Sequence, residues 1–163
     1  MAAMSDYLEN KLIDHAFRGV SFTAPTTLYT ALLTASPTDA NTTYGNEIGA
    51  TTPNGYARVG LQGNVTNWAS TGGATTTTNP SAGTSGTTSN NVTITFPAPS
   101  GGNWFNGAGP TASSITYFGI YDSATIGAGN LLWWGALTTA KTVNNGDAAP
   151  VFAISALSIQ IDN

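Results

Sequence analysis

Charged side chains and cysteine are scarce in this 163-residue chain. Only 7% of the residues are charged, whereas about a quarter is typical of globular domains. Cysteine is absent, which excludes a disulfide, a thiolate nucleophile and a zinc site built on thiolates. The chain has a single histidine, His15, so a metal site with two imidazole ligands is excluded as well.

The small number of cations excludes a further class of partner. Four Lys and Arg residues stand against eight Asp and Glu residues, which gives a formal net charge of −4. Four scattered cations cannot neutralise a run of phosphates, so we expect no nucleic-acid partner. Apolar stretches such as 131–137 are too short to span a bilayer, so we expect no membrane partner. No basic region followed by an apolar run opens the chain, and we expect it to fold in the cytoplasm.

Uncharged polar residues supply most of the polarity. The chain has 27 Thr, 13 Ser, 15 Asn and 19 Gly, while 40% of its residues are hydrophobic. This composition favours a β-rich body with long loops over disorder, which requires low hydrophobicity together with high net charge. A surface with so few repelling charges is typical of a protein packed against copies of itself or a partner. We therefore expect a homo-oligomer, either a trimer or a dimer.

One segment, residues 5–18, is predicted to be a helix. Asp6 is the expected N-cap, with Glu9 in the capping-box position, and Gly19 supplies the left-handed residue that ends a helix. The apolar residues of the segment recur on one broad face. A helix this short must dock that face to be stable. We therefore expect Leu12 to be buried against the rest of the domain or against a neighbouring subunit.

The rest of the chain is predicted to be all-β. Residues 21–163 show about seven or eight short strands separated by turn signals, which indicates an antiparallel sandwich or barrel in a single domain, 1–163, that includes the helix. The clearest strand is 91–97, in which large apolar residues alternate with polar ones. The segment 70–90 has no large apolar side chain and is predicted to be a flexible loop or an arm ordered by a partner. Long loops are expected at 39–55, 70–90 and 100–114.

No catalytic or metal-binding arrangement is evident. His15 lacks an identifiable orienting acid and nucleophile. Carboxylates that could form a glycosidase pair lie in turns or near the terminus, where Asp commonly makes local hydrogen bonds. No Asp-rich calcium spacing is present, and a structural ion between loop carboxylates is left as an alternative. We expect no enzyme activity, cofactor or metal site. The carboxylates considered are Asp39, Glu47, Asp122, Asp147 and Asp162.

Aromatic residues provide the candidate interface. Trp133 and Trp134 are neighbours in a predicted strand, so their side chains must point to opposite faces of a sheet. One can lie in the core, and the other then meets a second layer, a subunit or a ligand. Stacking on sugars, as in a carbohydrate-binding module, is one alternative function. The candidate interface residues are Trp68, Trp104, Phe105, Trp133 and Trp134.

Six segments of the chain form a recognisable set. They are DYLENKLIDH at 6–15, LYTALLTASPTD at 28–39, GYARV at 55–59, ITFP at 94–97, TYFGIYD at 116–122 and WGALTTAKTV at 134–143. Together they resemble a family of small virion proteins of tailed bacteriophages, described as tail-fibre-like, some members of which decorate the capsid as cement proteins. The resemblance covers most of the chain outside 70–90 and 100–113, and it implies a structural role without catalytic residues.

Composition and resemblance lead to the same expectation. We expect a structural protein of a bacteriophage virion, made in the cytoplasm of the host bacterium. Its partners would be further copies of itself and either the major capsid protein or tail proteins. Capsid decoration is the first hypothesis, because the sequence shows no repeating strand or coiled coil that would build a fibre shaft. A tail fibre or a tail-associated host-adhesion protein is the alternative.

Overall fold

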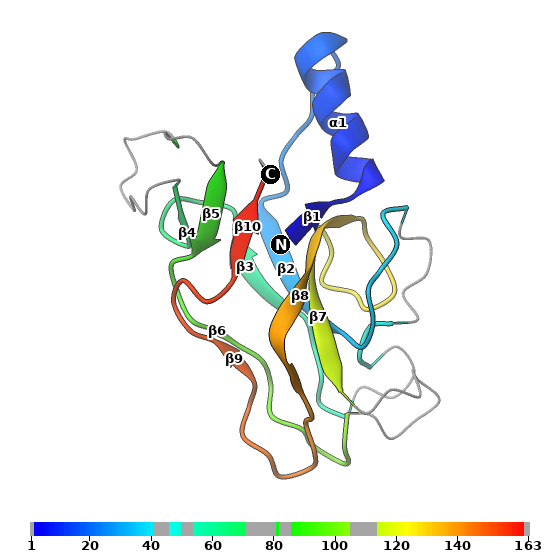
Figure 1. Ribbon diagram of the computed structural model, residues 1–163, viewed down its shortest axis with the longest axis vertical. Coiled ribbons are helices and arrows are strands. Elements are labelled where there is room, and N and C mark those ends of the chain that lie inside the picture. Colours follow the sequence, from blue (N-terminus) through cyan, green and yellow to red (C-terminus); the bar gives the residue numbers. More distant parts are fainter. Residues whose placement is uncertain are drawn as a thin grey trace.

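The computed structural model describes residues 2–40, 46–49, 54–70, 81, 86–104 and 114–161. In these residues one helix near the N-terminus is followed by a predominantly β body (Figure 1). The ten strands of the described chain pair antiparallel in three sheets that do not close into a barrel. The expected all-β class with one N-terminal helix is confirmed. The strand count exceeds the expected seven or eight because several strands have only two or three residues.

The largest sheet has five strands in the order β1-β8-β7-β2-β3. Its centre is the β7–β8 hairpin, which pairs Phe118 with Gly135 and Gly119 with Trp134. Strand β7 is buried over most of its length, as its apolar pattern on both faces predicts. The edge strand β1 was not expected from the sequence, because three residues are too few to show a strand pattern. The bounds are β1 Ala2–Met4, β2 Thr27–Leu33, β3 Val59–Gln62, β7 Ile115–Tyr121 and β8 Leu131–Lys141.

A second layer consists of two small sheets, β10-β5-β4 and β6-β9. In the predicted strand 91–97, Ile94 and Phe96 are buried while Thr93 and Thr95 are exposed, so the expected alternation is confirmed. Their strands are β4 Trp68–Ala69, β5 Thr87–Asn90, β6 Ile94–Thr95, β9 Val151–Phe152 and β10 Ser158–Gln160. One core joins this layer to the large sheet and contains Leu32, Ile94, Phe96, Phe118, Leu132, Leu157 and Ile159.

The loop expected over 70–90 is shorter than predicted, because Thr87–Asn90 forms strand β5. This polar segment has no hydrophobic alternation, so its strand depends on pairing with β4 and β10. The buried side chain of Asn90 fixes the strand further: its Nδ2 donates to the carbonyls of Val92 and Ala153, at 2.8 and 2.7 Å, and its Oδ1 accepts from the Leu157 amide at 2.9 Å. Parts of all three expected loops lie outside the described residues, namely 41–45, 50–53, 71–80, 82–85 and 105–113.

Helix α1 spans Asp6–Phe17, one residue shorter at each end than expected. Its N-cap is Ser5, not Asp6, and the Ser5 side chain accepts a hydrogen bond from the Leu8 amide. Gly19 has the left-handed φ of +70° predicted for the helix stop. Within the described chain no helix is long and apolar enough to cross a membrane.

The expected burial of Leu12 within the domain is wrong. Leu8 is the one buried residue of α1, and the Leu12 side chain is 37% exposed. The physical reason is the placement of the helix, which projects from the sheets rather than lying along them (Figure 1). Burial of Leu12 against a neighbouring subunit stays a prediction.

Candidate interaction site

Helix α1 presents apolar side chains to solvent. Phe17 is 84% exposed, and Ile13, one turn before it, is 51% exposed. Leu12 and Val20, the latter three residues beyond the end of α1, are also exposed. We call these four residues the α1 patch. Single exposed apolar residues are common on protein surfaces, whereas a contiguous group marks an interaction site. The α1 patch is therefore the strongest candidate interface in the described chain.

The base of α1 is fixed firmly to the large sheet. Strand β1 pairs with β8 through Met4 and Trp133. The Ser5 amide donates to the Leu132 carbonyl at 3.0 Å, and the Ser5 hydroxyl donates to the carbonyl of Leu131. These bonds hold the first turn in place, so the α1 patch at the other end of the helix has a defined position.

His15 has a local structural role at this end of the helix. Its Nδ1 accepts a hydrogen bond from the Phe22 amide at 3.3 Å, which ties α1 to the segment that returns to β2. Next to it, Arg18 and Asp14 form a partly exposed ion pair at 3.1 Å. Among the described residues, no carboxylate lies with His15 in a cleft where the two could act as a catalytic pair.

The predicted interface tryptophans contribute to packing rather than to an open surface. Trp104 is buried and meets the Tyr56 ring edge-on, with 5.2 Å between centroids. Trp68 is half-buried against the main core. The indole nitrogens of all four tryptophans are buried and lack a hydrogen-bond partner in the part of the chain that the structure describes. Phe105 lies outside the described residues. A sugar platform built from these tryptophans is not favoured by this placement.

Trp133 and Trp134 point to opposite faces of the large sheet, as predicted. Trp133 packs against the main core. Trp134 packs on the other face, against a smaller cluster that contains Tyr121, and its ring lies 6.0 Å from that of Tyr117. Both indoles are half-buried.

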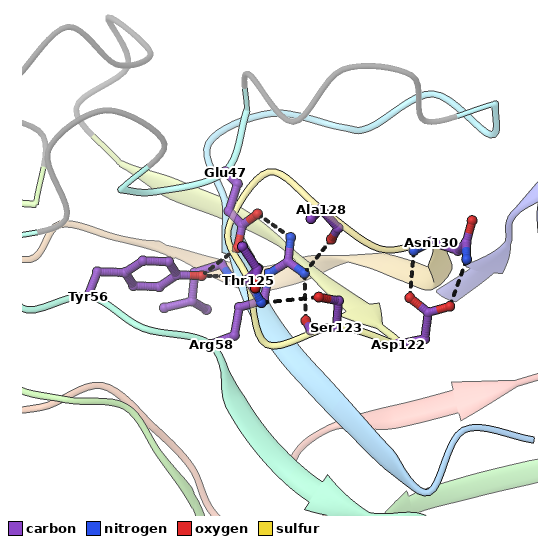
Figure 2. A network of polar contacts seen from close by, with 9 residues as sticks. Glu47, Tyr56, Arg58, Asp122, Ser123, Thr125, Ala128 and Asn130 are labelled. Carbon is purple, nitrogen blue, oxygen red and sulfur yellow. Dashed lines mark hydrogen bonds and ion pairs between the residues drawn. The ribbon is translucent and has the colours of Figure 1, made fainter.

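A buried ion pair lies at the centre of the polar network in Figure 2. Arg58 Nε and Nη2 donate to the two carboxylate oxygens of Glu47, at 2.7 and 2.6 Å, and neither side chain is exposed. Arg58 Nη1 also donates to the carbonyls of Ser123 and Ala128, at 2.7 and 3.0 Å. The guanidinium lies 3.9 Å from the centroid of the Tyr121 ring. One cation thus joins the segment before β3, the segment around Glu47 and the β7–β8 connection.

The network shifts two pKa values. Burial, together with the adjacent charge of Glu47, raises the pKa of Tyr56 well above its usual value. Burial alone would lower the pKa of Arg58, but the hydrogen bond and the charge of Glu47 outweigh that effect and raise it. Tyr56 Oη accepts from the Leu32 amide at 2.9 Å and donates to Glu47 at 3.3 Å. These groups are satisfied by one another, so the network stabilises the fold.

The other carboxylates considered from the sequence are not gathered into a site. Asp122 accepts from the amide and side chain of Asn130, at 2.6 and 2.7 Å (Figure 2), and Asp147 accepts from the Asn144 amide at 2.7 Å. Asp147 makes the local turn contact predicted for it, whereas Asp122 bonds across the β7–β8 connection to a residue eight positions away. Glu47 differs from the expectation, because it is buried and paired with a cation. Asp162 lies outside the described residues, and no group of three possible metal-ligating side chains occurs among the described ones.

Neither the α1 patch nor the buried ion pair was predicted from the sequence. A signal for the patch was available: Glu9, Ile13 and Phe17 are spaced four apart and therefore share one line on the helix. A carboxylate on that line argues against packing it into a domain core. For the ion pair, the sequence showed only that Glu47 and Arg58 belong to a small number of charged residues. It did not show that the two side chains meet.

The polar and aromatic contacts described above hold segments of the fold together. Comparison with known families indicates which kind of protein contains this fold. The model of the family described as Podophage GP4 fiber I protein gp80 matches residues 3–160. The chain belongs to this family. No curated protein matches it. Membership in the gp80 family makes the chain a structural protein of a tailed-phage virion, in agreement with the resemblance carried by its six segments.

Proposed function

We propose that this protein is a subunit of a fibre on the phage particle. It is present there in several copies, which assemble with one another through helix α1. The α1 patch carries the proposal. Exposed apolar surface of this kind is unfavourable in water and becomes favourable once a protein partner covers it. The description of the gp80 family, which names a fibre protein, supports the placement in a fibre.

The distribution of charge supports a role in assembly. Of the four Lys and Arg and eight Asp and Glu residues, Arg58 and Glu47 are buried in the interior. Even fewer charges therefore remain on the surface than the composition indicates. Such a surface gives little electrostatic repulsion between copies, which favours close packing in a homo-oligomer.

Capsid decoration is the second candidate function. The described residues form one small two-layered body, and no elongated or repeated strand array occurs among them that would build a fibre shaft. A small domain that bridges neighbouring capsid subunits gains its strength from many simultaneous contacts. On this alternative the partner of the protein is the major capsid protein rather than a tail protein.

The proposed role requires no catalysis, cofactor or metal ion. The two side chains with shifted pKa values, Tyr56 and Arg58, are buried in a network that holds segments of the fold together. Their hydrogen-bonding groups bind the protein itself, so they support stability rather than substrate chemistry.

Electron microscopy of virions labelled with an antibody against this chain tests the location. We expect label on the tail and its fibres and none on the head surface. Label distributed over the head would replace the fibre proposal with capsid decoration. Particles without any label, combined with detection of the chain only in infected-cell extracts, would contradict both.

A further inference from the structure

A cavity of about 610 Å³ lies toward the end of the molecule opposite α1. In Figure 1, β8 runs from the base of α1 toward the loop at the far end, and the cavity lies beside the last residues of β8 and the segment that leads to β9. Its lining reaches the main core through Leu32, Ile115 and Phe118. Val151 at its edge is exposed, so the cavity opens to solvent.

We propose that the α1 patch of one copy inserts into this cavity of the next copy, with Phe17 as the leading side chain. The inference deepens the proposed multi-copy role by naming the interface between copies, and it rests on that role. The contact joins two different surfaces of the same chain, so it repeats head to tail and produces a ring or a filament.

Shape and polarity support this pairing. The α1 patch follows the spacing of helix-in-groove recognition, in which side chains four residues apart serve as anchors. From Glu9 to Phe17 the line of side chains is about 12 Å long, at a rise of 1.5 Å per residue. The cavity volume lies within the range of about 300–1,000 Å³ that proteins use to enclose most of a bound group. A protruding helix with exposed apolar side chains and an open cavity lined mainly by apolar residues therefore occur on separate parts of one molecule.

The charges of Glu9 on α1 and Lys141 in the cavity lining favour the cavity as the partner of the α1 patch. Glu9 lies on the same line of α1 as Ile13 and Phe17 and is exposed. The cavity lining includes Lys141 and, among the described residues, no Asp or Glu. Lys141 is exposed, so its ammonium group can meet the Glu9 carboxylate of the inserted helix. The pairing then places opposite charges together at the rim of an apolar contact, which favours specificity.

Glu9 also argues against an interface formed by two α1 helices from different copies. In a parallel pair, Glu9 of one copy would face Glu9 of the other, and like charges repel. In an antiparallel pair, Glu9 would approach the C-terminal end of the partner helix, where Arg18 offsets the partial negative charge of the helix but is already paired with Asp14. The parallel arrangement therefore places the carboxylates unfavourably, and the antiparallel one offers Glu9 a cation that Asp14 already neutralises. The cavity offers it Lys141.

Variants of the full chain test the interface by sedimentation velocity over a range of concentrations. Phe17→Ser removes the leading aromatic side chain of the α1 patch. Ala148→Trp places a bulky side chain at an exposed position of the cavity lining, where it obstructs entry. We expect the wild-type chain to associate and each variant to be monomeric. Mixed one to one, the two variants should form a dimer that does not extend, since one retains its cavity and the other retains its patch. Val65→Ser, at an exposed apolar residue outside both surfaces, should associate like the wild type.

A charge swap provides a second test that leaves apolar packing unchanged. Glu9→Lys and Lys141→Glu should each weaken association about tenfold, and the double variant should restore it. Normal assembly of Ala148→Trp would overturn the proposal in favour of helix pairing. A mixture that stays monomeric, or a wild-type chain that never associates, would also overturn it. Because these measurements use purified protein, they can fail while antibody label on the tail still supports the proposed function.

Discussion

Arg58 and Glu47 neutralise each other through two hydrogen bonds in the interior, where neither side chain is exposed. Burial of two charges is costly, and it is tolerated when the geometry is good and further hydrogen bonds satisfy the remaining donors. The carbonyls of Ser123 and Ala128 satisfy Arg58 in this way. The pair therefore behaves as a unit, and the loss of one member leaves an uncompensated charge.

Glu47→Gln should destabilise the protein strongly, by about 3–5 kcal/mol in the free energy of unfolding. The change keeps the shape of the side chain and removes its charge, so Arg58 remains buried and unpaired. Asp14→Asn, at the partly exposed pair with Arg18, is the matched control and should cost at most about 1 kcal/mol. Urea unfolding of both variants gives the comparison, and equal losses would contradict a structural role for the buried pair.

Two leucines one turn apart on α1 should respond differently to the same substitution. Leu8→Ala removes a buried side chain and should cost about 2–5 kcal/mol. Leu12→Ala removes a side chain that the domain leaves partly exposed, and the isolated monomer should lose under about 1 kcal/mol. Thermal or urea unfolding at low protein concentration measures both. A large loss for Leu12→Ala in a verified monomer would show that α1 packs more closely than described.

Stability should fall at alkaline pH because of Tyr56. Its pKa is raised in the folded protein, so its contribution is fully present below the unfolded value of about 10. Above that pH the unfolded chain loses the proton while the folded chain retains it. The free energy of unfolding then decreases by about 1.4 kcal/mol per pH unit until the folded pKa is reached.

The Tyr56 effect can be separated from general alkaline unfolding by two variants. Tyr56→Phe should lower stability at neutral pH, since the Leu32 amide loses its acceptor, but it should flatten the alkaline dependence. Tyr7→Phe, at a partly exposed tyrosine of α1, should keep the wild-type pH profile. Urea midpoints between neutral pH and pH 11 decide the matter, and identical profiles for wild type and Tyr56→Phe would refute the assignment.

Ser5→Ala should loosen the attachment of α1. The Ser5 hydroxyl accepts from the Leu8 amide and donates to the Leu131 carbonyl, so the change removes both a helix cap and a tertiary bond. Loss of a cap alone costs about 1 kcal/mol. Hydrogen exchange should show faster exchange in the first turn of α1, whereas Ser21→Ala, at an exposed serine, should leave the rates unchanged. Unaltered exchange in Ser5→Ala would contradict the anchoring described for this residue.

The sequence predicted elements whose pattern is local. Strand β7 and its partner β8 are long and apolar, and the helix 5–18 has clear end signals. The N-cap was misplaced by one residue because Ser5 and Asp6 are both good caps. Ser5 takes the position because its hydroxyl also reaches Leu131, more than 100 residues away in the chain, and such a contact leaves no trace in local sequence.

Elements that depend on distant partners could not be predicted. The Thr-Thr-Ser-Asn sequence of β5 has no strand pattern, and its ladder is formed by β4 and β10. The periodicity of α1 shows which residues share a face but not what that face meets, so burial of Leu12 was expected against either the rest of the domain or a neighbouring subunit. The Arg58–Glu47 pair requires a loop to fold back, which composition does not reveal.

The number of copies of this chain in purified virions tests the central claim most directly. Quantitative mass spectrometry of purified particles, with the major capsid protein as internal reference, provides this number. A fibre subunit should stay with the particles through purification at a fixed copy number, far below that of the major capsid protein. Absence of the chain from purified particles, or a copy number equal to that of the major capsid protein, would contradict the account.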